Sequence, residues 1–187
     1  MKIRNCKFQI GVVLVVGMAV IGGCKSAQVA RPLTAELAGN SATDQLSFWH
    51  TLAERPVTSN DEAFHGLLLY LDGKDEAGAY GGRVEALKAR KMLPGGFDGA
   101  ANEGVRRGTV AVAMCRVLEL KGGVMMRLTG GNPRYAVREL VFLDLWPPST
   151  PWQTFSGNEF LGIMGRMEDY QRKPAGEKAG ATTQAAE

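Results

Sequence analysis

The sequence predicts a mainly α-helical domain of six helices, arranged as three helix-loop-helix pseudo-repeats. Three observations predict it. Apolar residues between positions 43 and 172 recur three and four residues apart, which is the spacing of one helix face. Glycines, prolines and capping residues divide this stretch into segments of helical length. A chain of 187 residues is also the size of one domain.

Six segments carry the helical spacing. The second begins at Ser59, whose hydroxyl can cap the helix while Glu62 completes a capping box, and it ends at Gly73. The fifth has Pro133 in its first turn, where a missing N–H costs nothing. Residues 124–128 (VMMRL) are the one candidate for a short strand. The predicted helices span 44–55, 59–73, 80–92, 107–120, 133–145 and 158–170.

The segments on either side of this domain have a different composition. Residues 24–42 are rich in Ala, Ser and polar residues and lack a sustained apolar period, so we interpret them as a flexible tether. Residues 173–187 contain no large apolar residue, which predicts a disordered tail. The folded domain is therefore expected to span 43–172.

Similar windows begin at Val57, Val105 and Phe155, at offsets of 48 and 50 residues. Each has an apolar residue, a small polar or basic start and then an apolar helix. The helices beginning near Tyr80 and Tyr135 also resemble each other in sequence. We therefore interpret the domain as three helix-loop-helix units, the first of them abbreviated.

These units resemble the S-layer homology module, in which one helix leads through a Gly-rich loop into a second helix opened by Ile-Thr-Arg-Ala-Glu-Phe. The best match is 87–120, where Val105 takes the Ile place, Arg107 the Arg place and Val110 the Phe place. Thr109 stands where the module has Glu. The similarity extends over some 130 residues, from 43 to 172.

The resemblance implies a fold and a function. Three such modules usually pack as a pseudo-threefold bundle and bind secondary polymers of the cell wall. The motif Arg and aromatic residues hold the polymer in grooves between modules. Gly157 replaces that Arg in the third unit and Ser59 replaces it in the first, so one of three Arg positions is kept.

The N-terminus has the features of a secretory signal. Lys2, Arg4 and Lys7 precede an apolar run over 8–21, which is shorter than the roughly 20 residues that cross a bilayer. An uncleaved N-terminal anchor is the alternative. Residues 21–24 (Ile-Gly-Gly-Cys) resemble the lipobox of bacterial lipoprotein signals, in which the chain is cut before a cysteine that is acylated.

That resemblance implies a signal peptide over 1–23, cleavage between Gly23 and Cys24, and lipidation of Cys24, including palmitate-type acylation of its amine. Membrane lipid would then be a partner through the acylated Cys24. The inner-membrane retention signal of such lipoproteins is an Asp after the cysteine, so Lys25 favours the outer membrane.

Charge and cysteine content agree with export. Loss of the three leader cations takes 22 basic residues to 19, against 19 acidic ones, so the mature chain has zero formal charge and no nucleic-acid partner is expected. Cys6 leaves with the leader and Cys24 is acylated. Cys115, in an apolar helical stretch, remains and is expected to be a buried small side chain.

Arg106, Arg107 and Trp152 are the candidate ligand-binding residues. Two arginines at a helix start oppose the helix dipole, and they could grip a phosphate or carboxylate on a wall polymer. A surface ion pair with Glu103 or another carboxylate is the alternative. Trp152 lies in a Pro-rich loop and is expected to be exposed, whereas Trp49 and Trp146 are expected to pack in the core.

No catalytic, metal-binding or cofactor-binding residues are predicted. His50 and His65 lie on different helices and are expected at helix surfaces. The turn at 95–99 is expected to be flexible, and the acidic cluster at 72–76 is expected to be solvated. An enzyme would regain support if His50, His65 and Cys115 converged in one pocket.

The leading hypothesis is therefore a non-enzymatic lipoprotein, exported and lipid-anchored in the bacterial envelope. Its helical domain would contact a cell-wall polysaccharide or a peptidoglycan-linked polymer in an anchoring or structural role. The alternative is a periplasmic or surface scaffold that binds an envelope protein and has no catalytic activity.

Overall fold

The computed structural model describes residues 26–30, 33–35, 37–120, 122, 124–129 and 131–174. The predicted signal peptide over 1–23, the cleavage site between Gly23 and Cys24 and the lipidation of Cys24 lie outside these residues. All but the first two positions of the tail expected over 173–187 lie outside them as well.

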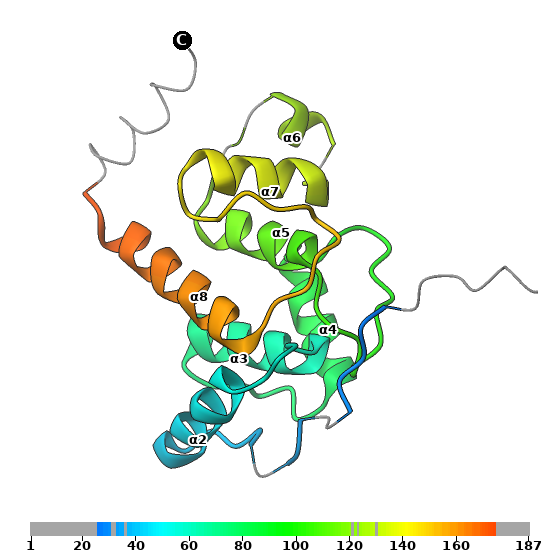
Figure 1. Cartoon of the computed structure of the whole chain (residues 1–187), viewed down its shortest axis with the longest axis vertical. Helices are drawn as coiled ribbons and strands as arrows, with labels where there is room; N and C mark the ends of the chain where they lie inside the picture. Colours follow the sequence, from blue (N-terminus) through cyan, green and yellow to red (C-terminus); the bar gives the residue numbers. More distant parts are fainter. Residues whose placement is uncertain are drawn as a thin grey trace, which may run out of the picture.

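The described chain is mainly α-helical, as predicted (Figure 1). Six helices of ten or more residues correspond to the six predicted segments. The possible strand over 124–128 is wrong, because this stretch forms the short helix α6. The helices are α2 (Ala42–Ala53), α3 (Asn60–Asp72), α4 (Tyr80–Ala89), α5 (Arg107–Val117), α6 (Val124–Leu128), α7 (Pro133–Phe142) and α8 (Gly157–Arg172).

Local signals set the ends of α3. Ser59 is its N-cap, and the capping box with Glu62 forms in both directions. Gly73 ends the helix in the left-handed conformation at φ 71°, where a residue with a Cβ would be strained. The expectations for this helix are confirmed at both ends.

Helices α4, α5 and α7 end about three residues earlier than predicted, for one shared reason. Lys91, Glu119 and Asp144 adopt positive φ values of 56°, 51° and 56°, and each reverses the chain. The next amide then bonds back five residues, as in Met92 N–H to Leu87 O at 2.9 Å. The residues that follow these reversals, Met92, Leu120 and Leu145, are apolar and pack on the core. They therefore continue the apolar spacing in the sequence beyond the end of each helix.

The helices form three main packing pairs, α3 with α4, α5 with α7, and α8 with α2. Each pair joins a helix that begins at one of the three repeated windows (α3, α5 or α8) to one of the other long helices (α4, α7 or α2). In the first two pairs the partner follows along the chain, and in the third the last helix returns to the first. The pairing is therefore cyclic (Figure 1).

Backbone hydrogen bonds join the segments that precede α3, α5 and α8 into a closed ring. Val105 N–H donates to Thr58 O at 2.9 Å, and Thr58 N–H donates to Phe155 O at 2.9 Å. Arg107 N–H donates to Gln153 O at 2.7 Å, which links the remaining two segments. The three helix starts thus meet at one place in the fold.

The N-caps correct the register of the repeat. They are Ser59, Arg106 and Ser156, so the helix starts are 47 (106 − 59) and 50 (156 − 106) residues apart. In the first unit Ser59 therefore takes the Thr place of the resembled motif, and Glu62 takes the Glu place. The alignment of the first window was off by one residue.

A close approach explains why Gly157 opens α8. A Cβ at this position would lie 1.5 Å from Leu52 O, and the Gly157 N–H donates to Arg55 O at 2.9 Å. The start of α8 therefore packs directly on the backbone at the end of α2, which excludes the arginine of the resembled motif.

The described part of the expected tether lies on the domain. Gln28 forms an antiparallel bridge with Glu103, and the Asn40 side chain bonds both backbone groups of Asp75, at 2.9 and 2.6 Å. The blue N-terminal segment in Figure 1 runs beside the green loop before α5. The folded unit therefore begins before residue 43.

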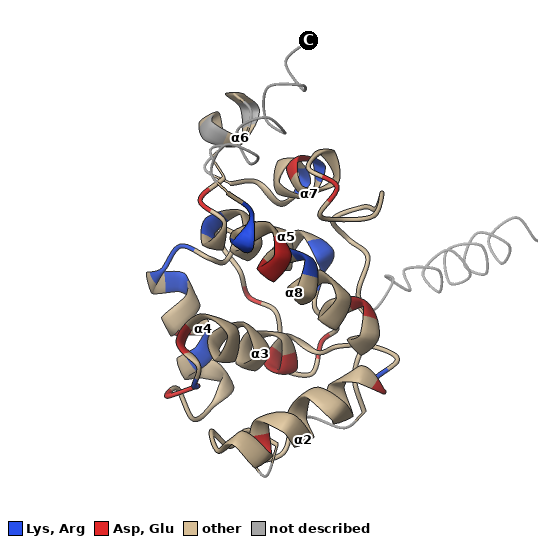
Figure 2. Ribbon diagram, turned by 90° about the vertical axis from the view of Figure 1, so that its left-hand side faces the viewer, with Lys and Arg blue, Asp and Glu red and all other residues tan. Residues whose placement is uncertain are grey.

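Positive and negative residues alternate over the described helices, with no face of a single sign in the view of Figure 2. In the part of the chain that the structure describes, no helix is both long enough and apolar enough to span a bilayer.

Candidate functional site

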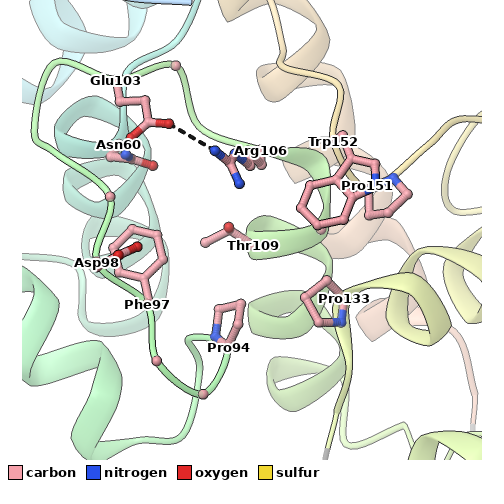
Figure 3. A pocket seen from close by; sticks show the side chains of 15 residues that line it. Asn60, Pro94, Phe97, Asp98, Glu103, Arg106, Thr109, Pro133, Pro151 and Trp152 are labelled. Carbon is pink, nitrogen blue, oxygen red and sulfur yellow. Dashed lines mark hydrogen bonds and ion pairs between the residues drawn. The ribbon is translucent and has the colours of Figure 1, made fainter. Parts of the chain in front are cut away.

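A groove opens at the start of α5, between two of the three joined segments. Arg106 and Trp152 stand in its middle, with a cavity of about 190 Å³ on one side and a wider cleft of about 900 Å³ on the other. Figure 3 shows Phe97 and Asp98 facing Pro133 and Pro151 across the smaller cavity, with Thr109 between them. Arg106 and Trp152 line both hollows and Arg107 lines the wider cleft, so the three predicted binding residues lie at one site.

Arg106 is held between a carboxylate and an aromatic ring. Its guanidinium donates to Glu103 Oε1 at 3.1 Å and to Ser26 Oγ at 3.2 Å. It also lies 5.7 Å from the centre of the Trp152 ring, within the range of a cation–π contact. The surface ion pair with Glu103, which was the alternative to ligand binding, is confirmed.

Trp152 is exposed, as predicted from its Pro-rich loop, with 73% of its surface accessible. The loop itself is fixed to the start of α5, because Gly108 N–H donates to Pro151 O at 2.9 Å. A Cβ on Gly108 would lie 2.6 Å from Pro133 Cβ and 2.9 Å from Pro151 Cβ, so a glycine is needed for this contact. The indole is thus presented to solvent by a rigid support.

Arg107 lines the wider cleft, but its guanidinium turns inward and is not the free group expected from the sequence. It is only 7% exposed, and its guanidinium donates to Glu159 Oε1 at 2.6 Å and to Thr154 O at 3.2 Å. The same group lies 4.7 Å from the centre of the Phe155 ring. Its donors hold the start of α8 against α5, so Arg107 is a structural residue.

The loop over 94–104 forms the opposite wall and is more ordered than expected. The Asn60 side chain donates to Ala100 O at 2.8 Å, and Tyr80 Oη donates to Gly99 O. Phe97 packs edge-on against Phe64, with ring centres 5.4 Å apart. The expectation of a flexible turn at 95–99 is wrong, because side chains from α3 and α4 fix it.

One sequence difference distinguishes the start of α5 from the starts of α3 and α8. At the third residue of α3 and of α8 stands a glutamate that caps the helix and receives an arginine, Arg55 on Glu62 at 3.0 Å and Arg107 on Glu159 at 2.6 Å. The third residue of α5 is Thr109, which is shorter and uncharged. The start of α5 therefore lacks the capping carboxylate that is present at the other two helix starts.

The electrostatics do not suit a phosphate. The first amides of α5, on Arg107 and Gly108, already donate to backbone carbonyls, so the helix start offers no open N–H cradle. The pKa of Glu103 is lowered, chiefly by a hydrogen bond from Ser26 and further by the Ala100 amide and by Arg106, so the ion pair persists at neutral pH. The groove offers a flat aromatic face bordered by charges that neutralise each other.

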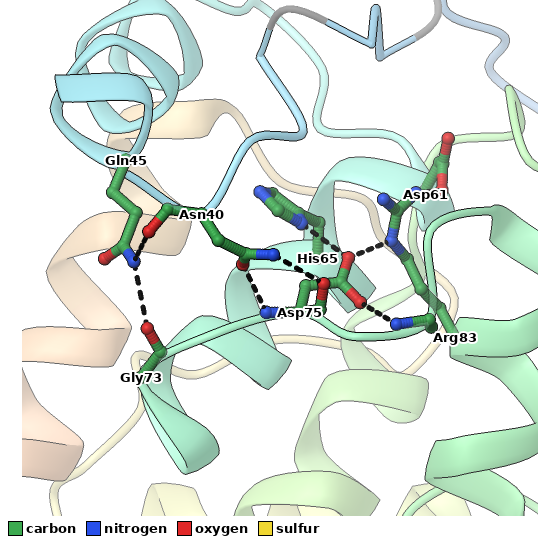
Figure 4. Close-up of polar contacts among 8 residues, drawn as sticks. Asn40, Gln45, Asp61, His65, Gly73, Asp75 and Arg83 are labelled. Carbon is green, nitrogen blue, oxygen red and sulfur yellow. Dashed lines mark hydrogen bonds and ion pairs between the residues drawn. The ribbon is translucent and has the colours of Figure 1, made fainter. Parts of the chain in front are cut away.

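A second polar cluster is buried between α3 and α4 (Figure 4). His65 Nδ1 lies 2.7 Å from Asp75 Oδ2, and Arg83 donates to Asp75 at 2.5 Å and to Asp61 at 2.6 Å. His65, Asp75 and Arg83 are almost fully buried. The expectations of a surface His65 and a solvated Asp75 are therefore wrong.

The titration of this cluster follows from its burial. Desolvation lowers the pKa of His65 and outweighs its hydrogen bond to Asp75, so the imidazole is neutral and donates through Nδ1–H. Burial alone would raise the pKa of Asp75, but hydrogen bonds from His65 and Arg83 bring it below its usual value. The cluster joins three segments through one carboxylate.

The structure places the other chemically reactive side chains apart. His50 is exposed on α2, whereas Cys115 is buried on α5 with its thiol near Ala136 O, and burial raises its pKa to about 12. Neither residue lines the cavities at Arg106, and His65 does not line them either. Among the described residues, no group of three or more His, Cys, Asp or Glu is placed to hold a metal ion.

Comparison with known proteins adds no family to this picture. The chain matches no family model, no curated protein and no solved structure.

Proposed function

We propose that this chain is an exported lipoprotein, anchored in the envelope through acylated Cys24, whose helical domain binds a glycan of the cell envelope without catalysing a reaction. The proposal rests on two independent supports. One is the lipobox-like sequence at residues 21–24, and the other is the groove at Arg106 and Trp152.

The observation that carries the binding function is the exposed Trp152 on a fixed loop. Its indole offers a flat apolar face, against which the C–H face of a sugar ring can pack. Arg106 and Glu103 lie at its edge, and Asp98 lies across the cavity, so hydroxyl groups have both donors and acceptors within reach. Such a combination of one apolar face and a few polar groups fits a carbohydrate.

The fold supports the same class of ligand. Cyclic helix pairing and the ring of helix starts agree with the bundle implied by the resemblance to S-layer homology modules, whose grooves bind wall polymers. The sequence led us to expect two free guanidinium groups, but Arg106 and Arg107 are both paired with carboxylates. We therefore propose a neutral glycan in place of an anionic polymer.

Co-sedimentation tests this function. A mature chain with Cys24→Ser, and hence without lipid, is mixed with purified wall material and with soluble envelope polysaccharide. We expect retention that Trp152→Ala reduces at least tenfold and that changes little with salt, because the contact is not charge-dominated. Phe142→Ala removes another exposed aromatic residue, on α7, and is the matched control.

Lack of binding to either material at low salt would contradict the proposal. So would equal retention of the wild type and the Trp152→Ala variant, since the groove would then not be the binding site.

A second candidate function is supported by exposed apolar side chains on α6 and α7. Val124, Leu128 and Phe142 are 71%, 76% and 50% exposed, which is unusual enough to suit a protein partner. The scaffold alternative predicts that Leu128→Glu abolishes crosslinking to one stoichiometric envelope protein. Leu46→Glu, at an exposed leucine on α2, should leave that crosslink intact.

A further inference from the structure

The N-terminal segment is part of the groove. Gly104 N–H donates to Ala27 O at 2.7 Å, and Val29 N–H donates to Asn102 O at 2.8 Å, so 27–29 adds an extended segment to the loop before α5. Ser26 lines the wider cleft and its hydroxyl accepts a hydrogen bond from Arg106. The polypeptide therefore enters the domain at the edge of the candidate binding site.

The distance from this edge to the lipid is short if Cys24 is acylated, as the proposed function states. A single residue, Lys25, separates Cys24 from Ser26. Two steps of fully extended chain span at most about 7 Å. The interfacial layer of one leaflet is itself about 5–7 Å thick. No free tether is left that could carry the groove away from the bilayer.

We propose that the groove binds its glycan at the bilayer surface, on a lipid-borne glycan in the same membrane as the anchor. This inference rests on the proposed function and specifies where its ligand lies. A wall strand held far from the membrane could not reach a groove whose rim is two residues from the acylated cysteine.

The exposed residues of the groove suit this position. Tryptophan is enriched where membranes meet water, because its ring is apolar and its N–H is polar. Trp152 is exposed, and Arg106 beside it contacts Ser26 where the chain enters the domain. Glu103 and Asp98 in the same groove offset the charge of Arg106, so the groove favours a neutral sugar headgroup over a bare anionic lipid.

Vesicle flotation tests the inference. The probe is a total bacterial lipid extract, used untreated or after periodate oxidation, which cleaves the vicinal diols of sugars; vesicles of purified phosphatidylglycerol, whose headgroup also carries a vicinal diol, are the control and should give no flotation. The protein is the mature chain with Cys24→Ser, so that its own lipid cannot carry it to the vesicles. We expect flotation with untreated vesicles, reduced at least tenfold by periodate or by Trp152→Ala and unchanged by Phe142→Ala.

The outcomes separate the two proposals. Binding to wall material or soluble polysaccharide without flotation would overturn the membrane-surface inference and leave the proposed function standing. Flotation that periodate does not affect would overturn the inference as well, because the protein would bind the lipid surface itself. Binding to none of the three materials would overturn both.

A spacer variant gives a second readout. In the lipidated protein, reconstituted in vesicles of brominated phospholipid, we expect Trp152 fluorescence to be quenched, measured as the difference between the wild type and Trp152→Phe. Insertion of twenty Gly and Ser residues between Lys25 and Ser26 should reduce that quenching at least twofold. Equal quenching with and without the spacer would contradict the short attachment.

Discussion

Two arginines of this protein make the same kind of contact in opposite surroundings. Arg83 pairs with Asp61 and Asp75 where its side chain is 3% exposed, whereas Arg106 pairs with Glu103 where its side chain is 45% exposed. A buried pair is strongly destabilising to break, because it leaves an uncompensated charge. An exposed pair contributes little to stability, so its partners can be exchanged for a ligand. The comparison distinguishes a structural cluster from the proposed binding site.

The largest expected effect is at the buried cluster. Asp75→Asn removes the charge that faces Arg83 and His65, and we expect a loss of about 3–5 kcal/mol in the free energy of unfolding, measured in urea. Asp72→Asn is the matched control, since Asp72 forms a half-exposed pair with Arg90. It should cost less than about 1 kcal/mol. Similar losses for the two variants would contradict the structural role of the cluster.

The groove should show the converse behaviour. Trp152→Ala removes the proposed stacking surface, and we expect a loss of about 2 kcal/mol in glycan binding, which is roughly thirtyfold in Kd. The free energy of unfolding should change by less than about 0.5 kcal/mol, because the side chain is exposed. Calorimetry measures the glycan affinity, and urea unfolding measures the stability. A large loss of stability with unchanged glycan affinity would mean that Trp152 is a structural residue and not a binding residue.

Acid should act first on the buried cluster. Because the folded-state pKa of His65 is lowered, the unfolded chain binds more protons below its ordinary value of 6.5. Stability should therefore be constant above about pH 6.5 and fall below it, by at most about 1.4 kcal/mol per pH unit. The lowered pKa values of Asp75, Glu103 and Glu159 add losses only below their ordinary values of 3.8 to 4.5.

Urea unfolding between pH 7.5 and 5 checks this pH dependence. His65→Gln should flatten the curve in that window. His50→Gln, at an exposed histidine, should leave its shape unchanged. A flat curve for the wild type would mean that His65 is protonated equally in the folded and unfolded chains.

The two adjacent arginines should differ in their effect on stability. Arg106→Gln should leave the free energy of unfolding within about 0.5 kcal/mol of the wild type. Arg107→Gln should cost about 1.5–3 kcal/mol, because a guanidinium that is 8% exposed loses its charged hydrogen bonds to Glu159 and Thr154. Equal costs would contradict their assignment to surface and interior.

The sequence predicts the fold where local chemistry decides it. The capping box of Ser59, the left-handed Gly73 and the first-turn Pro133 act within a few residues, so α3 and the start of α7 agree with the pattern. Lys91, Glu119 and Asp144 adopt the left-handed conformation, which non-glycine residues rarely take. The sequence pattern therefore predicts the ends of α4, α5 and α7 too late. The six-helix content did not depend on those ends.

The site was predictable only in part. The Pro-rich loop indicated that Trp152 is exposed, since prolines exclude it from a helix. Arg106 and Arg107 are adjacent in sequence, but one is the N-cap and the other the first helical residue, so tertiary contacts decide which faces solvent. The capping box of α8 places the Glu159 carboxylate at the helix start, and this pattern could have indicated a partner for Arg107. His65 and Asp75 meet only through the turn after α3, which apolar spacing does not reveal.

The most direct test of the binding site is the tryptophan side-chain spectrum of the mature Cys24→Ser chain during titration with soluble envelope polysaccharide. Its three tryptophans give three indole N–H signals in a proton–nitrogen correlation spectrum. We predict that the Trp152 signal, assigned with Trp152→Phe, shifts and saturates, while those of Trp49 and buried Trp146 stay in place. A Trp152 signal that remains unmoved at saturating polysaccharide would contradict the account.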